Sequence, residues 1–220
     1  MMAEARLPIA RMTRTRRAWV PVLGWSLLAF GAALTTRSGA DHVLRGTFAF
    51  VVLPLVAYGI VAGALGGAGL KASVRPLVLL GAKTPRAAGA VIAVSCMFSA
   101  LVSAALGALV CVLAHRTGDP PVIADALATA GISALGGAAY AAYFCAGSAI
   151  GKGTMRGLFL AMDWLMGGGA GFGSILVPRG HVLSLLGGAP AFELSSKASS
   201  LFLVALILAY AALAMRLARR

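Results

Sequence analysis

The chain has 220 residues, of which 60% are hydrophobic and only 11% are charged, and its mean hydropathy is +0.92. A soluble domain carries roughly 25% charged residues, so this composition excludes a soluble globular enzyme and predicts a polytopic membrane protein. The net charge of +13 comes from basic residues at the ends of apolar stretches, as the positive-inside rule expects. No basic patch with interleaved aromatic residues indicates nucleic-acid binding.

The first predicted elements are a basic arm over residues 1–17 and an uncharged stretch over 18–36. The arm has five arginines against one acid, and we expect it to lie on the anionic inner leaflet of the membrane. The 19 uncharged residues are enough for one transmembrane helix. A signal peptide cleaved near residues 38–40 is the alternative. The retained helix is favoured, because the apolar core of a signal peptide has only roughly 7–15 residues.

The second predicted span covers residues 47–69. Pro54 removes one hydrogen bond from this helix and predicts a kink. Gly59, Gly63 and Gly67 recur at a spacing of four, which predicts a ridge that packs against another helix rather than a binding site.

A basic turn over residues 71–86 separates the second span from the third, and it contains no acidic residue. Residues 74–80 are apolar on one side, which predicts a short amphipathic helix under the membrane surface. This turn has the length and the pattern to dock a partner protein.

Residues 87–114 and 122–150 are the third and fourth predicted spans. Three small residues of the third span fall on one face: Ser99, Ser103 and Gly107. In the external turn at 115–121, Asp119 before Pro120 predicts an N-cap followed by proline at the first helical position, and therefore a structural role.

The fifth and sixth predicted spans cover residues 158–177 and 198–215. Between them, residues 181–197 are apolar enough to enter a membrane and too short to cross it. A glycine–proline break at 187–190 favours a re-entrant hairpin, which must be buried in protein or line a cavity. The predicted fold is thus all-α: a basic arm over 1–17 and a six-span transmembrane domain over 18–220.

The basic residues predict the orientation of these spans. Fourteen of the 19 lie on the side that carries both termini, and five, Arg179 among them, lie on the other side. Both termini are therefore expected in the cytoplasm, with the chain multi-pass in the inner membrane.

Three patterns that approach catalytic or metal sites are interpreted as structural. The segment 147–154 is close to a phosphate-binding loop, but its glycine spacing is wrong and no strand precedes it, so this chain is not expected to hydrolyse nucleotides. Ser174 and His181 could suggest a serine nucleophile and its base, yet His181 is expected at the membrane surface, out of reach. No His, Asp or Glu pair in the spans has metal-ligand spacing. The three cysteines, all within apolar stretches, are expected to be buried and inert: Cys96, Cys111 and Cys145.

Asp163 is the one acid well inside a predicted span. An acid in this position is either a paired structural residue or part of a translocation or coupling path. Arg156 lies seven residues earlier on the same helical face, and it is the expected partner. Glu193, in the predicted re-entrant segment, is a second candidate for the path, at its external mouth.

The arrangement resembles the membrane subunits of ABC transporters, and in particular the ABC-2-type exporter permeases. The resemblance rests on the basic arm, the broken stretch before the last span, and the sequence RPLVLLGAKTPRAAGA at 75–90, which is similar to that family's coupling helix. Family members often carry an acid ahead of this helix, whereas residues 66–70 here contain none.

The resemblance implies a dimer of permease subunits, formed by two copies or by a homologue, with separate cytoplasmic ATPase subunits that hold ATP and magnesium. This chain itself would bind no cofactor. The residues implied in docking the ATPase are Arg75, Leu77, Leu79, Leu80, Lys83 and Arg86. A non-catalytic binding or scaffold subunit, such as the substrate-binding component of a vitamin importer, is the alternative, and an intramembrane enzyme is a third hypothesis.

Overall fold

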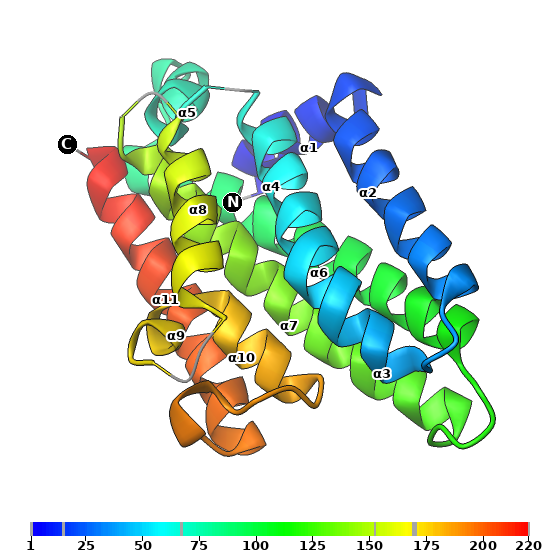
Figure 1. The fold of residues 1–220 in the computed structure, drawn as a ribbon. Coiled ribbons are helices and arrows are strands. Elements are labelled where there is room, and N and C mark those ends of the chain that lie inside the picture. The colour runs from blue at the N-terminus through cyan, green and yellow to red at the C-terminus, as the bar shows by residue number, and fades with distance from the viewer. Residues whose placement is uncertain (1, 15, 67, 152, 169–170, 220) are drawn as a thin grey trace.

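The computed structural model describes residues 2–14, 16–66, 68–151, 153–168 and 171–219, and the regular structure in these ranges is helical. The long helices α6 (Thr84–Ala114) and α7 (Val122–Ala149) cross the middle of the bundle, and the third long helix, α11 (Ser196–Arg219), lies along one edge (Figure 1). Pro85 in the first turn of α6 supplies the fixed φ that suits this position, and Pro121 directly precedes α7.

Helices α6 and α7 pack closely because small residues face each other between them. A Cβ on Gly137 would lie 2.5 Å from Ser103 Oγ and 2.7 Å from the Ser99 carbonyl oxygen, and a Cβ on Gly107 would collide with Ser133. The three serines are fully buried. The predicted small-residue face of the third span is confirmed, and it is a helix-packing surface.

The N-terminal part of the chain covers one side of this centre. It comprises α1 (Met2–Arg14), α2 (Arg16–Thr35), α3 (Ala40–Val43), the π-helix η1 (Leu44–Val52) and α4 (Leu53–Leu65). A Cβ on Gly59 would lie 3.3 Å from Val22 Cγ2, so this glycine packs against α2. Gly63 faces the same side and borders Met12 and Trp19. Gly67 lies outside the described residues.

The second predicted span is helical on both sides of Pro54. The nine residues of η1 that precede α4 adopt the wider π-helical turn. Pro54 has no N–H to donate to the Phe50 carbonyl four residues earlier, so one α-helical hydrogen bond is missing where η1 meets α4.

Four helical segments of the described chain are long and apolar enough to cross a membrane: Ala40–Leu79, Thr84–Ala114, Val122–Ala149 and Ser196–Arg219. The first predicted span corresponds to the shorter apolar stretch Trp19–Thr35. The structure thus has the helices of a multi-pass membrane protein, and the count of six spans stays a prediction.

The prediction of a continuous fifth span over 158–177 is wrong. Helix α8 (Met155–Met166) ends early, and α10 (Pro178–Leu185) starts a new helix in a different direction (Figure 1). The short helix α9 (Gly173–Leu176) lies between them. At about 1.5 Å per residue, α8 and α10 are roughly 18 and 12 Å long, so each is a half-helix, too short to cross a membrane's roughly 30 Å core alone.

The predicted re-entrant segment is only partly helical. Its first residues belong to α10, and a turn through Gly187 (φ 82°) leads to the 3₁₀ helix η2 (Ala191–Glu193). Arg45 Nη1 donates a hydrogen bond to the Gly187 carbonyl (2.7 Å) and holds this turn against the start of η1. Glu193 is exposed, with a φ of 60°.

Asp119 is not the predicted N-cap, because α7 begins at Val122 after Pro121. Its carboxylate instead accepts hydrogen bonds from the backbone N–H of Arg116 (2.8 Å) and of Ala40 (3.3 Å). The structural role holds in a different form: Asp119 ties the α6–α7 turn to the start of α3. The Arg116 hydrogen bond lowers the pKa of Asp119 below its ordinary value.

Candidate functional site

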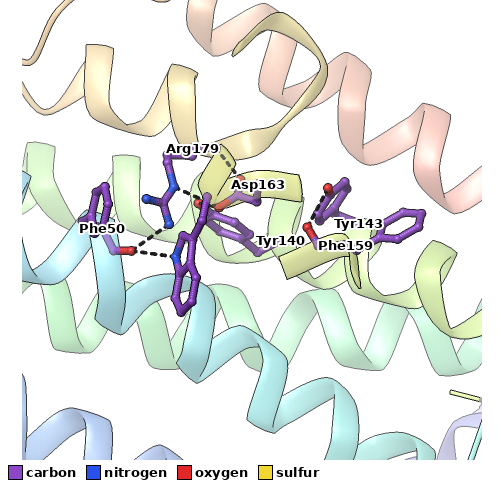
Figure 2. A network of polar contacts seen from close by, with 7 residues as sticks. Phe50, Tyr140, Tyr143, Phe159, Asp163 and Arg179 are labelled. Carbon is purple, nitrogen blue, oxygen red and sulfur yellow. Dashed lines mark hydrogen bonds and ion pairs between the residues drawn. The ribbon is translucent and has the colours of Figure 1, made fainter. Parts of the chain in front are cut away.

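A buried ion pair joins the two half-helices in the interior of the bundle. Asp163 lies in the last turn of α8 and Arg179 in the first turn of α10. Arg179 Nε lies 3.0 Å from Asp163 Oδ2, and both side chains are 0% exposed (Figure 2). A charged group in an apolar interior persists only when it is paired and hydrogen-bonded, so each residue depends on the other.

Two further donors complete the carboxylate of Asp163. The backbone N–H of Arg179 donates to Oδ1 (3.2 Å), and the hydroxyl of Tyr140 on α7 donates to Oδ2 (3.1 Å). The carboxylate therefore lies at the N-terminus of α10, where free N–H groups and the helix dipole favour negative charge.

The carbonyl of Phe50 in η1 accepts a second hydrogen bond from the guanidinium of Arg179. Arg179 Nη2 donates to it over 2.8 Å and Trp164 Nε1 over 3.3 Å. Pro54, four positions after Phe50, has no N–H, so the Phe50 carbonyl lacks its α-helical donor and can accept from Arg179 and Trp164.

Aromatic rings cover the guanidinium. The centroid of the Phe50 ring lies 4.0 Å from Arg179 Cζ, and that of the Trp164 ring lies 5.8 Å away. Figure 2 shows the guanidinium between Phe50 and Asp163. Both rings are more than two-fifths exposed, so they form the outer wall over the ion pair.

Side chains also satisfy the carbonyls that the break between α8 and α10 leaves free. Tyr210 on α11 donates its hydroxyl to the Leu176 carbonyl (2.6 Å), and Ser174 donates to the Gly171 carbonyl (2.8 Å). His181 Nε2 donates to the Ile175 carbonyl (3.0 Å). Non-helical backbone in an apolar interior requires such partners.

The position of His181 relative to the membrane stays a prediction, but its side chain lies in the interior of the bundle. It is fully buried, and its ring stacks on Phe202 of α11 at a centroid distance of 5.4 Å. Its Nε2 and the hydroxyl of Ser174 both bind loop carbonyls, which is a structural arrangement for the two residues. The sequence placed His181 outside because Pro178 looked like the end of a span, whereas Pro178 starts α10.

The predicted partner of Asp163 is also wrong. Arg156 is buried at the other end of α8, about 10 Å along the helix axis. Its Nε donates to the Gly153 carbonyl (3.1 Å), and its Cζ lies 5.6 Å from the centroid of the Tyr58 ring. A shared helical face was therefore too weak a criterion, because Asp163 reaches across to another helix.

Sequence reasoning missed Arg179, Tyr140, Trp164 and the Phe50 carbonyl. Two signals were present: Pro54 frees a carbonyl in the second span, and Pro178 directly before Arg179 indicates a helix start with a cation in apolar sequence. The other predicted path residue, Glu193, is exposed in η2 and makes none of the contacts described above.

The predicted docking residues lie on and beside α5 (Leu70–Leu79), at the end of the molecule where α8 begins (Figure 1). Leu79 and Leu80 are 77% and 85% exposed. Leu77 is 7% exposed and faces the bundle, so it belongs to the core instead. The exposed basic residues around this helix are Lys71, Arg75, Lys83 and Arg86.

Among the residues that the structure describes, no three His, Cys, Asp or Glu side chains are placed to hold a metal ion. Comparisons with protein-family models, with curated proteins and with solved structures find no match to this chain.

Proposed function

We propose that this chain is the transmembrane permease subunit of an ATP-driven transporter of the ABC exporter type, and that α5 and the turn after it dock a separate cytoplasmic ATPase. The subunit would act as a dimer in the inner membrane, with both termini in the cytoplasm. ATP and magnesium would be bound by the partner.

The exposed end of α5 carries this proposal. Val78, Leu79 and Leu80 project from the bundle, while Leu70, Val74 and Leu77 anchor the opposite face of the helix. Large apolar side chains gathered at an exposed tip are costly in water and mark a contact surface. The exposed cations around them would add charge complementarity and orientation to that contact.

The broken fifth span supports transport as the activity. Transporters commonly place discontinuous helices and ionisable residues in the middle of the membrane, where the half-helix ends contact the path. The α8–α10 break has both features in Asp163 and Arg179.

The experiment is purification of the tagged chain from its native cells in mild detergent, with mass spectrometry of the bound proteins. The test variant is Leu79→Asp with Leu80→Asp, because two buried carboxylates would break an apolar contact. We expect the parent protein to co-purify with a stoichiometric amount of an ATPase, and the double variant to co-purify with at least tenfold less of it. Thr117→Asp, at an exposed position of the external turn, is the matched control and should retain the ATPase.

Other outcomes discriminate between the hypotheses. Unchanged recovery of the ATPase with the double variant would show that α5 is not the docking site. Recovery of only membrane proteins with the parent would favour a binding or scaffold subunit, such as a vitamin-importer component. Leu77→Asp should reduce the amount of folded protein instead, because Leu77 lies in the core.

A further inference from the structure

The α4–α5 connection and the α7–α8 connection touch through their backbones. A Cβ on Gly69 would lie 2.8 Å from the Gly151 carbonyl oxygen, 3.0 Å from the Ser148 carbonyl oxygen and 3.2 Å from the Gly153 N. A Cβ on Gly153 would lie 3.1 Å from backbone atoms of Ala68 and Gly69. Such close contact leaves no room for the α4–α5 connection to move closer to the α7–α8 connection, so a displacement of α5 in that direction also displaces the start of α8.

Helix α8 extends from this contact to the ion pair. Arg156 in its first turn is fastened to the Gly153 carbonyl, and Asp163 in its last turn is fastened to Arg179. A 12-residue helix with intact internal hydrogen bonds moves as one piece. A shift at residues 151–153 therefore reaches Asp163 without any change within the helix.

The ion pair is the main polar link between α8 and α10. Asp163 contacts Arg179 through both the guanidinium and the backbone N–H at the start of α10. Ser174 lies directly against that first turn, because a Cβ on Gly180 would lie 2.7 Å from the Ser174 carbonyl oxygen. A cavity of 160 Å³ begins at Gly167 and Gly180 beside the pair and reaches residues 188–191.

We propose that the Asp163–Arg179 pair is a latch which keeps the α8–α10 break closed, and that movement of α5 releases it through the Gly69–Gly153 contact and α8. The proposal rests on the proposed function only for the identity of the partner that moves α5. Closed and open states are discrete, because the two charges are either paired in the dry interior or separated and hydrated. Release would admit water from the cavity beside Gly167 to Ser174 and Arg179.

The test measures the accessibility of Ser174→Cys to N-ethylmaleimide in membrane vesicles. Cys96, Cys111 and Cys145 are replaced by alanine, so that the reporter is the single thiol. Ser174 is fully buried in the closed state, so we expect slow labelling of the parent reporter. Arg179→Gln should raise the initial labelling rate at least tenfold, whereas Arg179→Lys, which keeps the charge but cannot bond both Asp163 and the Phe50 carbonyl as Arg179 does, should raise it less.

Two milder variants keep the test informative if Arg179→Gln does not fold. Tyr140→Phe removes only the hydroxyl that supports the carboxylate, and it should raise the rate two- to threefold. Gly69→Ala forces the two connections apart and should raise the rate at least threefold. Gly157→Ala, on α8 with nothing within 4 Å of the added Cβ, is the matched control and should leave the rate unchanged.

The outcomes separate the parts of the proposal. A folded Arg179→Gln or Tyr140→Phe protein that labels at the parent rate would overturn the latch. The Arg179→Gln protein could label fast while a folded Gly69→Ala protein labels at the parent rate. That result would support the Asp163–Arg179 latch and would overturn the proposal that α5 controls it. The assay needs no ATPase, so failure to recover one would refute the proposed function without affecting this measurement.

Discussion

The α6–α7 pair and the α8–α10 break meet the same physical requirement in opposite ways. In an apolar environment every backbone N–H and C=O needs a partner within the protein. Helices α6 and α7 supply these partners internally over 31 and 28 residues and meet through glycine and serine. The break leaves carbonyls of loop and π-helix free and satisfies them with side chains from other elements.

This difference indicates which part of the molecule can change its conformation. Separating α6 from α7 would disrupt an interface in which small residues bring the two helices into close contact. Such dense packing resists small displacements. Opening the break requires the exchange of a few side-chain hydrogen bonds and one ion pair. We therefore expect the Asp163–Arg179 pair and the residues around it to move, while α6 and α7 form a rigid frame.

The sharpest test of the comparison is Arg179→Met. It leaves Asp163 buried without its cation, and we expect a loss of about 3–5 kcal/mol in the free energy of unfolding. The double variant Arg179→Met, Asp163→Asn should lose less free energy of unfolding, because it has no unpaired buried charge. Equilibrium unfolding in mixed micelles containing dodecyl sulfate measures both. Arg75→Met, at an exposed site, is the control, and equal losses in the single and double variants would contradict a coupled pair.

A second test concerns the frame. Gly137→Ala places a Cβ 2.5 Å from Ser103 Oγ and 2.7 Å from the Ser99 carbonyl oxygen. Overpacking of this kind costs about 1–3 kcal/mol. Gly131→Ala on the same helix meets nothing within 4 Å, so it should be neutral or slightly stabilising. The same unfolding assay compares the two, and an equal effect would show that the α6–α7 contact is loose.

A third test removes one tyrosine hydroxyl that binds a carbonyl at the α8–α10 break and one that binds a carbonyl within a continuous helix. Tyr210→Phe deprives the Leu176 carbonyl, at the end of α9, of its donor and should cost about 1 kcal/mol. Tyr143→Phe removes a donor from the Phe159 carbonyl, which lies within α8 and keeps a helical partner, so the loss should be smaller. Larger destabilisation by Tyr143→Phe would contradict the distinction between the two regions.

The smallest expected effect is at Asp119, which joins the α6–α7 turn to the start of α3. Since folding lowers its pKa, Asp119 stabilises the folded state above its unfolded pKa of about 3.9, and this contribution is lost as the pH falls through the folded pKa. Asp119→Asn should lower the unfolding temperature by about 2 °C at pH 7 and by less as the pH approaches 3. Glu193→Gln, at an exposed acid, is the control; a difference that persists at pH 3 would show that the carboxylate charge is irrelevant.

Much of the fold could be predicted because local sequence determines it. Apolar length predicted α6, α7 and α11 to within four residues at each end, and small-residue spacing predicted which residues share one face of α6. The break in the fifth span was missed because residues 158–177 are apolar apart from Asp163 and Ser174, and composition alone does not show where a helix stops. The run of glycines in the second half of that span was the available signal, because glycine weakens a helix interior.

The apolar and helical character of the chain, the ends of its long helices and its basic segments could be predicted from the amino-acid sequence, because these properties depend on neighbouring residues and on the helical period. The pairing of Asp163 with Arg179 rather than with Arg156, and the contact of Arg179 with the Phe50 carbonyl, became visible only in the folded protein. The groups concerned are 16 and 129 residues apart. Which of them meet depends on how η1, α7, α8 and α10 pack, because a buried charge must find its partners wherever packing brings them.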